Sequence, residues 1–436
     1  MRTGVGVAAP VARWSPVAGS LALSAGFVLA GASSALAGLF ARVVVTPVRR
    51  PTENLRILAV VDGPSGLEVV LPANEQTTVP GTYSLTFDGG ASCARIGRIT
   101  TFDPRDGTIT RAVDHVYSGD LRSAVQGRFT GFVYPRPRDA GLDAREGRVP
   151  VPGGPAPGWR VDPPPASDGR ARAGDGVWAI MVHGRGARRN EGLRAVPSAS
   201  RLGMTSLLIS YRNDGDAPDA QDGRYGLGTT EWRDVEAAVR YALRHGAQDV
   251  VLFGWSMGGA IALQCVDRSD LASHVRGLVL TGPVVDWIDV LEHQARLTRI
   301  PEAIGVVGTW LISNRAGRFV TGLAAPVDFK ALNWVARAEQ LRVPTLIMHS
   351  EDDEYVPVGP SMDLAERNPA LVRFVRFTRA RHTKEWNVDP EKWDRTARGW
   401  LRAVLTADRP GRARHGAISP AGRADAAAAP AADRDR

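Results

Sequence analysis

The chain contains few cysteines and few lysines. Its 436 residues include two cysteines, Cys93 and Cys265, which predicts two free thiols and not a disulfide framework. Lysine occurs only at positions 330, 384 and 392, so arginine carries most of the positive charge. The eight histidines are scattered without the spacing of metal ligands, and we expect neither a metal nor another cofactor.

Acidic residues are absent from residues 1–50, which hold five arginines. Residues 409–436 carry six arginines against three aspartates, so the two ends account for the net charge of +8. The body between them is formally neutral, which disfavours a basic face for nucleic acid, and we expect no nucleic-acid partner. The tail 409–436 consists mainly of Ala, Arg, Pro and Asp, and is expected to be disordered.

Charged residues are also absent from Trp14 to Ala41, a span of 28 residues rich in Ala, Gly, Leu and Val. This span is long enough to cross a bilayer, so residues 1–50 are predicted to form a transmembrane anchor and the protein to be membrane-associated. Arginines flank both sides and leave the orientation open. The alternative is an exported protein, cleaved after Ala37 at the small-x-small triplet Ala35-Leu36-Ala37.

Three patterns divide the rest of the chain. Short β-branched and aromatic stretches such as "GTYSLTF" and "GRFTGFVY" predict a small β-rich domain over residues 51–135. Residues 136–174 are dense in Pro and Gly and predict a connector without regular structure. Over residues 175–408, apolar strands such as "VWAIMVHG" alternate with helical patterns, which predicts an α/β fold with a doubly wound, mainly parallel sheet. An insertion at about 285–342, rich in tryptophan, is expected to be a lid or additional core.

The stretch "VVLFGWSMGGAIALQ" over residues 250–264 places one serine between glycines where a strand pattern changes into a helix pattern. Gly254 and Gly258 relieve crowding at such an abrupt turn, and Ser256 would then stand at the N-terminus of the helix. This is the G-x-S-x-G arrangement of a nucleophilic serine. Ser256 is the only serine of the chain with glycine at both flanking positions in this context.

A nucleophilic serine needs a base to take its proton and a carboxylate to orient that base. In hydrolases with this turn the acid follows the serine and the histidine comes last. His382 follows the strand-like stretch "LVRFVRFTRA", whereas His415 lies in the tail, so His382 is the predicted base. The acid is expected in "LIMHSEDDEYVPV", after another apolar strand, among Glu351, Asp352, Asp353 and Glu354.

The segment "HSEDDEYVP" resembles the H-G-x-x-D-x-x-V-P signature of α/β-hydrolase-fold enzymes. The resemblance implies that Asp353, three residues before Val356, is the acid of a Ser-Asp-His triad. Ser350 stands where the family usually has glycine, which keeps Asp352 as the alternative.

The segment "MVHGRG" is similar to the H-G-x-G loop of the same family. It implies an oxyanion hole formed by the backbone N–H groups of Arg185 and Met257, with His183 holding the loop. The resemblance covers roughly residues 175–405 and extends to the bacterial prolyl-oligopeptidase-like and BEM46-like hydrolases.

This resemblance implies a serine hydrolase that cleaves a carboxylic ester, thioester or amide through an acyl-enzyme, with a small acyl compound as its substrate. Acyl transfer by the same residues is an alternative, because the acyl-enzyme can also be released to an alcohol or amine. A non-catalytic, membrane-tethered binding scaffold is a third interpretation. The β-rich domain and the connector are expected to keep the hydrolase part away from the lipid.

Overall fold

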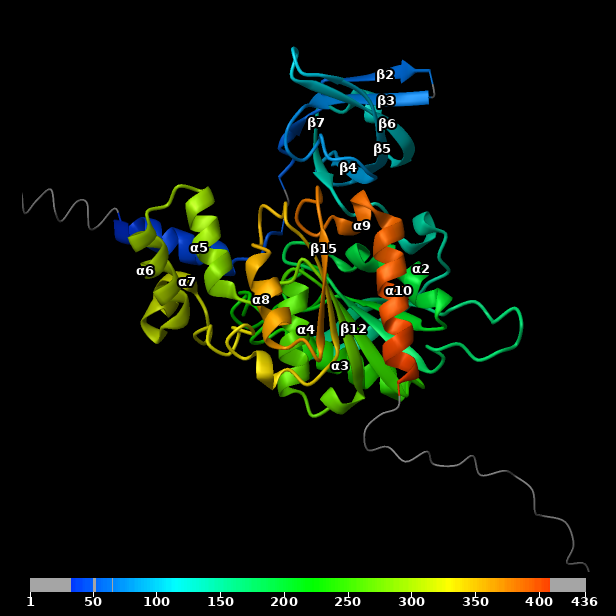
Figure 1. Ribbon diagram of the computed structural model, residues 1–436. Helices are drawn as coiled ribbons and strands as arrows, with labels where there is room; N and C mark the ends of the chain where they lie inside the picture. Colours follow the sequence, from blue (N-terminus) through cyan, green and yellow to red (C-terminus); the bar gives the residue numbers. More distant parts are fainter. Residues whose placement is uncertain (1–32, 50–51, 65, 408–436) are drawn as a thin grey trace, which may run out of the picture.

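The computed structural model describes residues 33–49, 52–64 and 66–407 (Figure 1). A β-rich domain sits on one end of a larger α/β domain, next to the loops that follow β15. Most of the predicted anchor, residues 1–32, lies outside the described residues, and so does the tail 409–436.

The β-rich domain is a seven-stranded sheet in the order β1-β7-β4-β5-β6-β3-β2, with every neighbouring pair antiparallel. Alternate residues of its strands form a separate core, which confirms the predicted small β-rich domain. Its strands are β1 (Leu55–Arg56), β2 (Ala59–Gly63), β3 (Gly66–Pro72), β4 (Tyr83–Phe87), β5 (Ser92–Asp103), β6 (Thr108–Ser118) and β7 (Gln126–Thr130).

The larger domain is built on an eight-stranded sheet in the order β15-β14-β13-β12-β10-β11-β9-β8. The six strands from β15 to β11 run parallel, and β9 and β8 continue the sheet in antiparallel pairing. The strands are β8 (Arg145–Val151), β9 (Gly154–Val161), β10 (Val177–Val182), β11 (Thr205–Ile209), β12 (Asp249–Trp255), β13 (Val275–Thr281), β14 (Thr345–Ser350) and β15 (Val372–Phe377).

Helices cover both faces of this sheet, with α3 and α4 on one face and α2 and α10 on the other. The predicted doubly wound, mainly parallel α/β sheet is therefore confirmed. The helices are α2 (Val196–Arg201), α3 (Trp232–Arg244), α4 (Met257–Arg268), α5 (Trp287–Leu297), α6 (Glu302–Ser313), α7 (Arg318–Thr321), α8 (Gly359–Arg367), α9 (Glu385–Val388) and α10 (Pro390–Thr406).

The predicted connector over residues 136–174 is not a connector throughout. Strands β8 and β9 lie within it and extend the main sheet at its edge. Strand β8 is the edge strand, and β9 pairs with β11 only from Gly158 to Val161, so Pro155 and Pro157 of β9 have a strand neighbour on one side alone. Prolines are tolerated at such positions, where not every N–H group is needed for pairing. The alternating apolar residues between the prolines are buried, namely Val149, Val151, Ala156, Trp159 and Val161.

The described part of the predicted anchor segment, residues 33–49, packs on the α/β domain. Residues 33–45 are helical and bury Ala37, Ala41 and Val45. This helix lies beside α6 and α7 (Figure 1), so the β-rich domain and residues 136–174 do not separate it from the hydrolase-like part as expected. Within the described ranges, none of the helices has the length and apolar composition needed to cross a membrane.

The insertion at about 285–342 forms α5, α6 and α7. Trp287 and Trp334 anchor it, since both side chains are buried. The indole N–H of Trp287 donates a hydrogen bond to the carbonyl of Leu227 (2.9 Å). Helix α5 also contacts the loop after β14, where the side chains of His293 and Gln294 lie 3.1 and 2.8 Å from backbone carbonyl oxygens.

Candidate active site

Ser256 is the single residue between β12 and α4, at the carboxyl end of the parallel strands. Its φ of 51° and ψ of −120° form a conformation that costs a non-glycine residue about 1–3 kcal/mol. A Cβ atom at Gly258 would lie 2.1 Å from the carbonyl oxygen of Val182, and one at Gly254 would lie 2.7 Å from that of Gly258. The two glycines therefore permit the sharp turn that puts the Ser256 hydroxyl at the N-terminus of α4.

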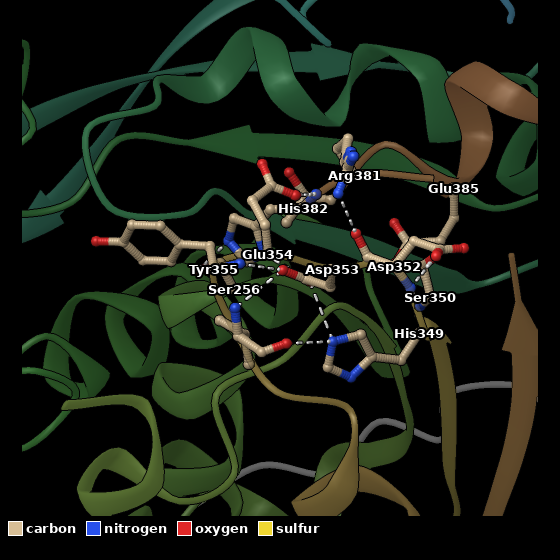
Figure 2. Close-up of polar contacts among 12 residues, drawn as sticks. Ser256, His349, Ser350, Asp352, Asp353, Glu354, Tyr355, Arg381, His382 and Glu385 are labelled. Atoms are coloured by element: carbon tan, nitrogen blue, oxygen red, sulfur yellow. Dashed lines mark hydrogen bonds and ion pairs between the residues drawn. The ribbon is translucent and has the colours of Figure 1, made fainter. Parts of the chain in front are cut away.

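The structure places Ser256, His382 and Asp353 in one hydrogen-bonded chain (Figure 2). Nδ1 of His382 lies 2.8 Å from Oδ2 of Asp353, and Nε2 lies 2.9 Å from Oγ of Ser256. The three residues follow β12, β14 and β15, so parallel strands deliver them to the same edge of the sheet. The side chain of Asp353 is fully buried, whereas that of His382 is 19% exposed.

The Asp353 carboxylate is held at both oxygens. Oδ1 accepts the backbone N–H groups of Tyr355 (2.8 Å) and Val356 (2.9 Å), and Oδ2 accepts from His349 (3.1 Å) as well as His382. Burial alone would raise the pKa of Asp353, but the positive charge available on His382 and the hydrogen bonds from both histidines hold it well below its usual range. The carboxylate is therefore ionised at neutral pH.

Asp352, the alternative acid, does not face His382. Its side chain is exposed and accepts the backbone N–H of Arg379 at 2.5 Å. Ser350, the departure from the family signature, is buried, and its N–H donates to Glu385 (3.2 Å). The serine at this position therefore does not shift the register: Asp353, and not Asp352, lies beside the imidazole of His382.

The surroundings of His382 favour its protonated form. Burial lowers the pKa of His382, but the charge and hydrogen bond of Asp353 outweigh it, and Glu385 and Glu354 add to the increase. Glu385 is fully buried, and burial together with the nearby Asp353 raises the pKa of its carboxyl to about 8. The ring of Tyr355 lies 5.1 Å from that of His382 and covers part of the imidazole.

The loop after β10 borders Ser256. A Cβ atom at Gly184 would lie 3.2 Å from the Cβ of Ser256. The N–H of Gly184 is already bound by the carboxylate of Glu191 (2.7 Å). In the described part of the chain, the N–H groups of Arg185 and Met257 have no protein acceptor. These are the two groups that the family resemblance assigns to an oxyanion hole.

His183 is held inside this loop. It is buried, and its Nε2 lies 3.1 Å from a carboxylate oxygen of Asp214. Its ring stacks on Tyr211 at 4.2 Å, and the Tyr211 hydroxyl donates to the carbonyl of His183 (3.0 Å). His183 therefore fixes the loop and does not face the Ser256 hydroxyl.

The β-rich domain reaches the loops that carry Asp353 and His382. The side-chain amide of Gln76 donates to the carboxylate of Glu354 and accepts from the ammonium group of Lys384. The same carboxylate accepts the backbone N–H of His382 (3.2 Å). Gln76 therefore joins the acid loop to the histidine loop, a role that no sequence motif marks.

A buried polar network also joins the two domains. Nη1 of Arg194 donates to the side chain of Asn387 (2.6 Å), and its guanidinium pairs with Glu191 (3.3 Å), the acceptor of the Gly184 N–H. The side-chain amide of Asn387 donates to the carbonyls of Thr82 (2.7 Å) and Gly131 (3.0 Å) in the β-rich domain. Sequence reasoning missed these residues because they meet only in the folded chain.

The cysteines take no part in this site. Cys93 and Cys265 are buried and unpaired, and burial raises the pKa of the Cys93 thiol to about 11 and that of Cys265 still further. Across residues 33–49, 52–64 and 66–407, no cluster of three or more His, Cys, Asp or Glu side chains is arranged to hold a metal ion.

Two family profiles match separate parts of the chain. Residues 179–298 match the family described as alpha/beta hydrolase fold, and residues 56–130 match a domain of unknown function (DUF8805). No curated protein sequence matches the chain.

Solved structures resemble it at low sequence identity. The Pyrococcus furiosus esterase Pf2001 covers 62% of this chain over 95% of its own length, with 17% identity and a TM-score of 0.46. A puromycin-hydrolyzing peptidase of Mycobacterium tuberculosis covers 78% of this chain over 46% of its own, with 15% identity and a TM-score of 0.45. An esterase from Exiguobacterium antarcticum covers 59% over 100%, with 20% identity and a TM-score of 0.40. On its sheet order and on the family profile over residues 179–298, the larger domain of the chain has the α/β-hydrolase fold.

Proposed function

We propose that the protein is a serine hydrolase that cleaves a carboxylic ester, thioester or amide through an acyl-enzyme. The observation that carries the proposal is the hydrogen-bonded chain from Asp353 through His382 to Ser256, at a strained strand-to-helix turn. A serine hydroxyl is a poor nucleophile until a base accepts its proton, and an imidazole oriented by a carboxylate is such a base.

In the acylation step, Ser256 Oγ forms a bond to the substrate carbonyl carbon while its proton moves to Nε2 of His382. The ionised Asp353 accepts the hydrogen bond from Nδ1 and stabilises the imidazolium that results. The proton on Nε2 then passes to the leaving alcohol, thiol or amine as its bond to the carbonyl carbon breaks. In deacylation, water gives a proton to Nε2 of His382 and attacks the acyl ester on Ser256. The proton then returns to Ser256 Oγ as the acid product leaves, which restores the free serine.

The tetrahedral intermediate carries a negative oxygen, which needs donors in fixed positions. The N–H groups of Arg185 and Met257 are the donors that we assign, because neither is used within the described protein. Met257 follows Ser256 in the chain, and Arg185 follows Gly184, which borders Ser256. Two such donors typically contribute about 3 kcal/mol each to lowering the barrier. Glu191 supports the first of them indirectly, since it holds the preceding N–H group of Gly184.

The test is a panel of p-nitrophenyl esters of increasing acyl length, together with a fluorophosphonate probe that labels activated serines. The wild type should hydrolyse at least one ester and become labelled, and Ser256→Ala should do neither. Ser123→Ala, which removes an exposed serine of the β-rich domain, is the matched control and should behave like the wild type. Equal labelling of the wild type and Ser256→Ala would rule out the proposed mechanism.

A further inference from the structure

Exposed apolar side chains gather on one side of the protein, around α5, α6, α7 and the helix of residues 33–45. Nine of the fifteen large hydrophobic residues exposed in the described chain lie there. We call these nine residues the apolar face, and in Figure 1 the elements that carry it lie together on the left. They are Leu36, Leu39, Val43, Leu297, Val306, Val307, Trp310, Phe319 and Val320.

Helix α6 is the least expected part of this face. After Glu302 it contains no charged residue, and it exposes Val306, Val307 and Trp310 to 57%, 44% and 50%. A helix that is apolar on all sides is normally buried, because water does not favour any of its faces. Phe319, on α7, is 80% exposed, so the apolar surface continues beyond α6. Large exposed apolar patches of this kind mark sites of interaction with a membrane or with another protein.

The elements of the face are packed into one surface. A Cβ atom at Gly308 of α6 would lie 2.6 Å from the ring of Phe40, and one at Gly38 would lie 2.9 Å from Val320. Arg42 donates a hydrogen bond to the carbonyl of Val320 (3.1 Å). The helix of residues 33–45, α6 and α7 therefore present their outer side chains together. Residues 33–41 of this helix are the last part of the sequence stretch from Trp14 to Ala41 that contains no charged residue.

Arginines mark the α7 end of the face, whereas Glu292 of α5 and Glu302 at the start of α6 border its other end beside Val306. Residues 303–327 contain no acidic residue, and neither do residues 33–49. Arg42, Arg315 and Arg318 lie among the apolar residues and are exposed. Phosphate headgroups of anionic lipids attract such arginines. Tryptophan and arginine beside aliphatic side chains are the composition expected where a protein lies in a membrane interface.

We propose that the apolar face docks on an anionic lipid bilayer, with the helix of residues 33–45, α6 and α7 lying in the headgroup region. Lipid headgroups fit the face better than a second copy of the chain, because Arg42, Arg315 and Arg318 stand among its apolar side chains, whereas the acidic Glu292 and Glu302 lie at its other end. The proposal places α6 and α7 on the lipid surface, opposite to the expectation that the hydrolase part is held away from it. It concerns binding and does not depend on the proposed reaction.

The test uses the full chain with single cysteines that carry an environment-sensitive fluorophore. The native Cys93 and Cys265 are buried, which leaves an introduced surface thiol as the reactive one. Phe319→Cys and Val307→Cys report on the face. Phe102→Cys and Val125→Cys, at exposed apolar positions of the β-rich domain, are the matched controls. Vesicles consist of phosphatidylcholine alone or of phosphatidylcholine mixed with phosphatidylglycerol.

With the mixed vesicles, the labels at 319 and 307 should shift to shorter emission wavelengths and be quenched by brominated lipid, whereas those at 102 and 125 should not. The shift should weaken in phosphatidylcholine alone and at high salt, because screening removes the attraction of the arginines. Unchanged labels at 319 and 307, or equal shifts at all four positions, would overturn the proposal. The proposal would also be overturned if the labels at 319 and 307 already emitted at shorter wavelengths than those at 102 and 125 in the absence of vesicles. If that shift grew with protein concentration, it would indicate a second copy of the chain; if not, it would indicate that residues 1–32 cover the face.

Discussion

At the scale of single residues, Asp353 and His382 carry different parts of the proposed chemistry. His382→Ala removes the base and should lower kcat by about four orders of magnitude or more, and Asp353→Asn by a comparable or somewhat smaller factor. KM should change little in both, because neither side chain is assigned to substrate binding. Steady-state kinetics on the best ester of the panel measures both effects.

Asp352→Asn is the control for the acid. Within the described residues, its exposed carboxylate accepts a hydrogen bond from the Arg379 N–H and does not face His382, so the variant should retain most of the activity. If Asp352→Asn inactivated the protein and Asp353→Asn did not, the assignment of the acid would be wrong.

The sequence indicated Ser256 and His382 through local pattern and chain order. Four consecutive carboxylates left the acid open, and only the fold shows which one turns inward.

The pH dependence of activity follows from the environment of His382. Its pKa is raised above the ordinary value of 6.5, and only the neutral imidazole accepts the serine proton. As pH falls through the raised pKa, kcat/KM should therefore decline, with the acidic limb above pH 6.5. In Asp353→Asn the main cause of the increase is gone, so the limb of the residual activity should move to lower pH. An unmoved limb would mean that another group limits the rate.

Glu385 predicts a pH dependence of stability. Its folded-state pKa of about 8 lies above the ordinary 4.5, so the native protein keeps a proton that the unfolded chain has released. The free energy of unfolding should therefore fall as pH rises from about 4.5 to about 8, and level off above. Glu385→Gln cannot ionise and should flatten this decline, as urea unfolding over the same range would show. A decline of the same slope in the variant would assign it to other groups.

At the scale of elements, the turn between β12 and α4 depends on the space that Gly258 leaves. Gly258→Ala would drive a methyl group into the backbone carbonyl of Val182, at 2.1 Å, and should lower the free energy of unfolding by about 2 kcal/mol or more. Gly399→Ala in α10 is the matched control. No atom lies within 4 Å of the added Cβ there, and the variant should be more stable by about 0.5–1 kcal/mol. Thermal unfolding of both variants measures the contrast.

The elements that sequence predicted well have strong local patterns. Strands β10 to β14 are mainly apolar runs, β15 mixes apolar residues with two arginines, and helical periodicity separates most of these strands, which form the parallel sheet. Strands β8 and β9 were missed because their prolines conceal the alternation of apolar residues, and pairing with β11 is a long-range event. Residues 33–45 belong to the segment that the sequence predicts to be a transmembrane anchor. Its composition is equally suited to packing against α6, and composition alone does not distinguish the two environments.

At the scale of the whole molecule, the two domains share the site. The acid and histidine loops belong to the α/β domain, but Gln76 of the β-rich domain lies between Glu354 and Lys384 and links them. Contacts of this kind join residues about 280 to 310 positions apart, and no local pattern contains them. The sequence therefore predicted the three residues that the fold brings into one hydrogen-bonded chain, and missed the residues that hold their loops.

Gln76 is the residue through which this sharing can be measured. Gln76→Ala would remove both of its links, so the loop that carries His382 should sample more positions and spend less time with Nε2 at Ser256. We expect kcat to fall by about three- to tenfold, with KM nearly unchanged and little loss of stability. Gln126→Ala, at an exposed glutamine of the same domain, is the matched control and should change neither kcat nor KM. A raised KM with unchanged kcat would instead show that Gln76 binds the substrate, because a positioning residue acts on the reaction step that follows binding.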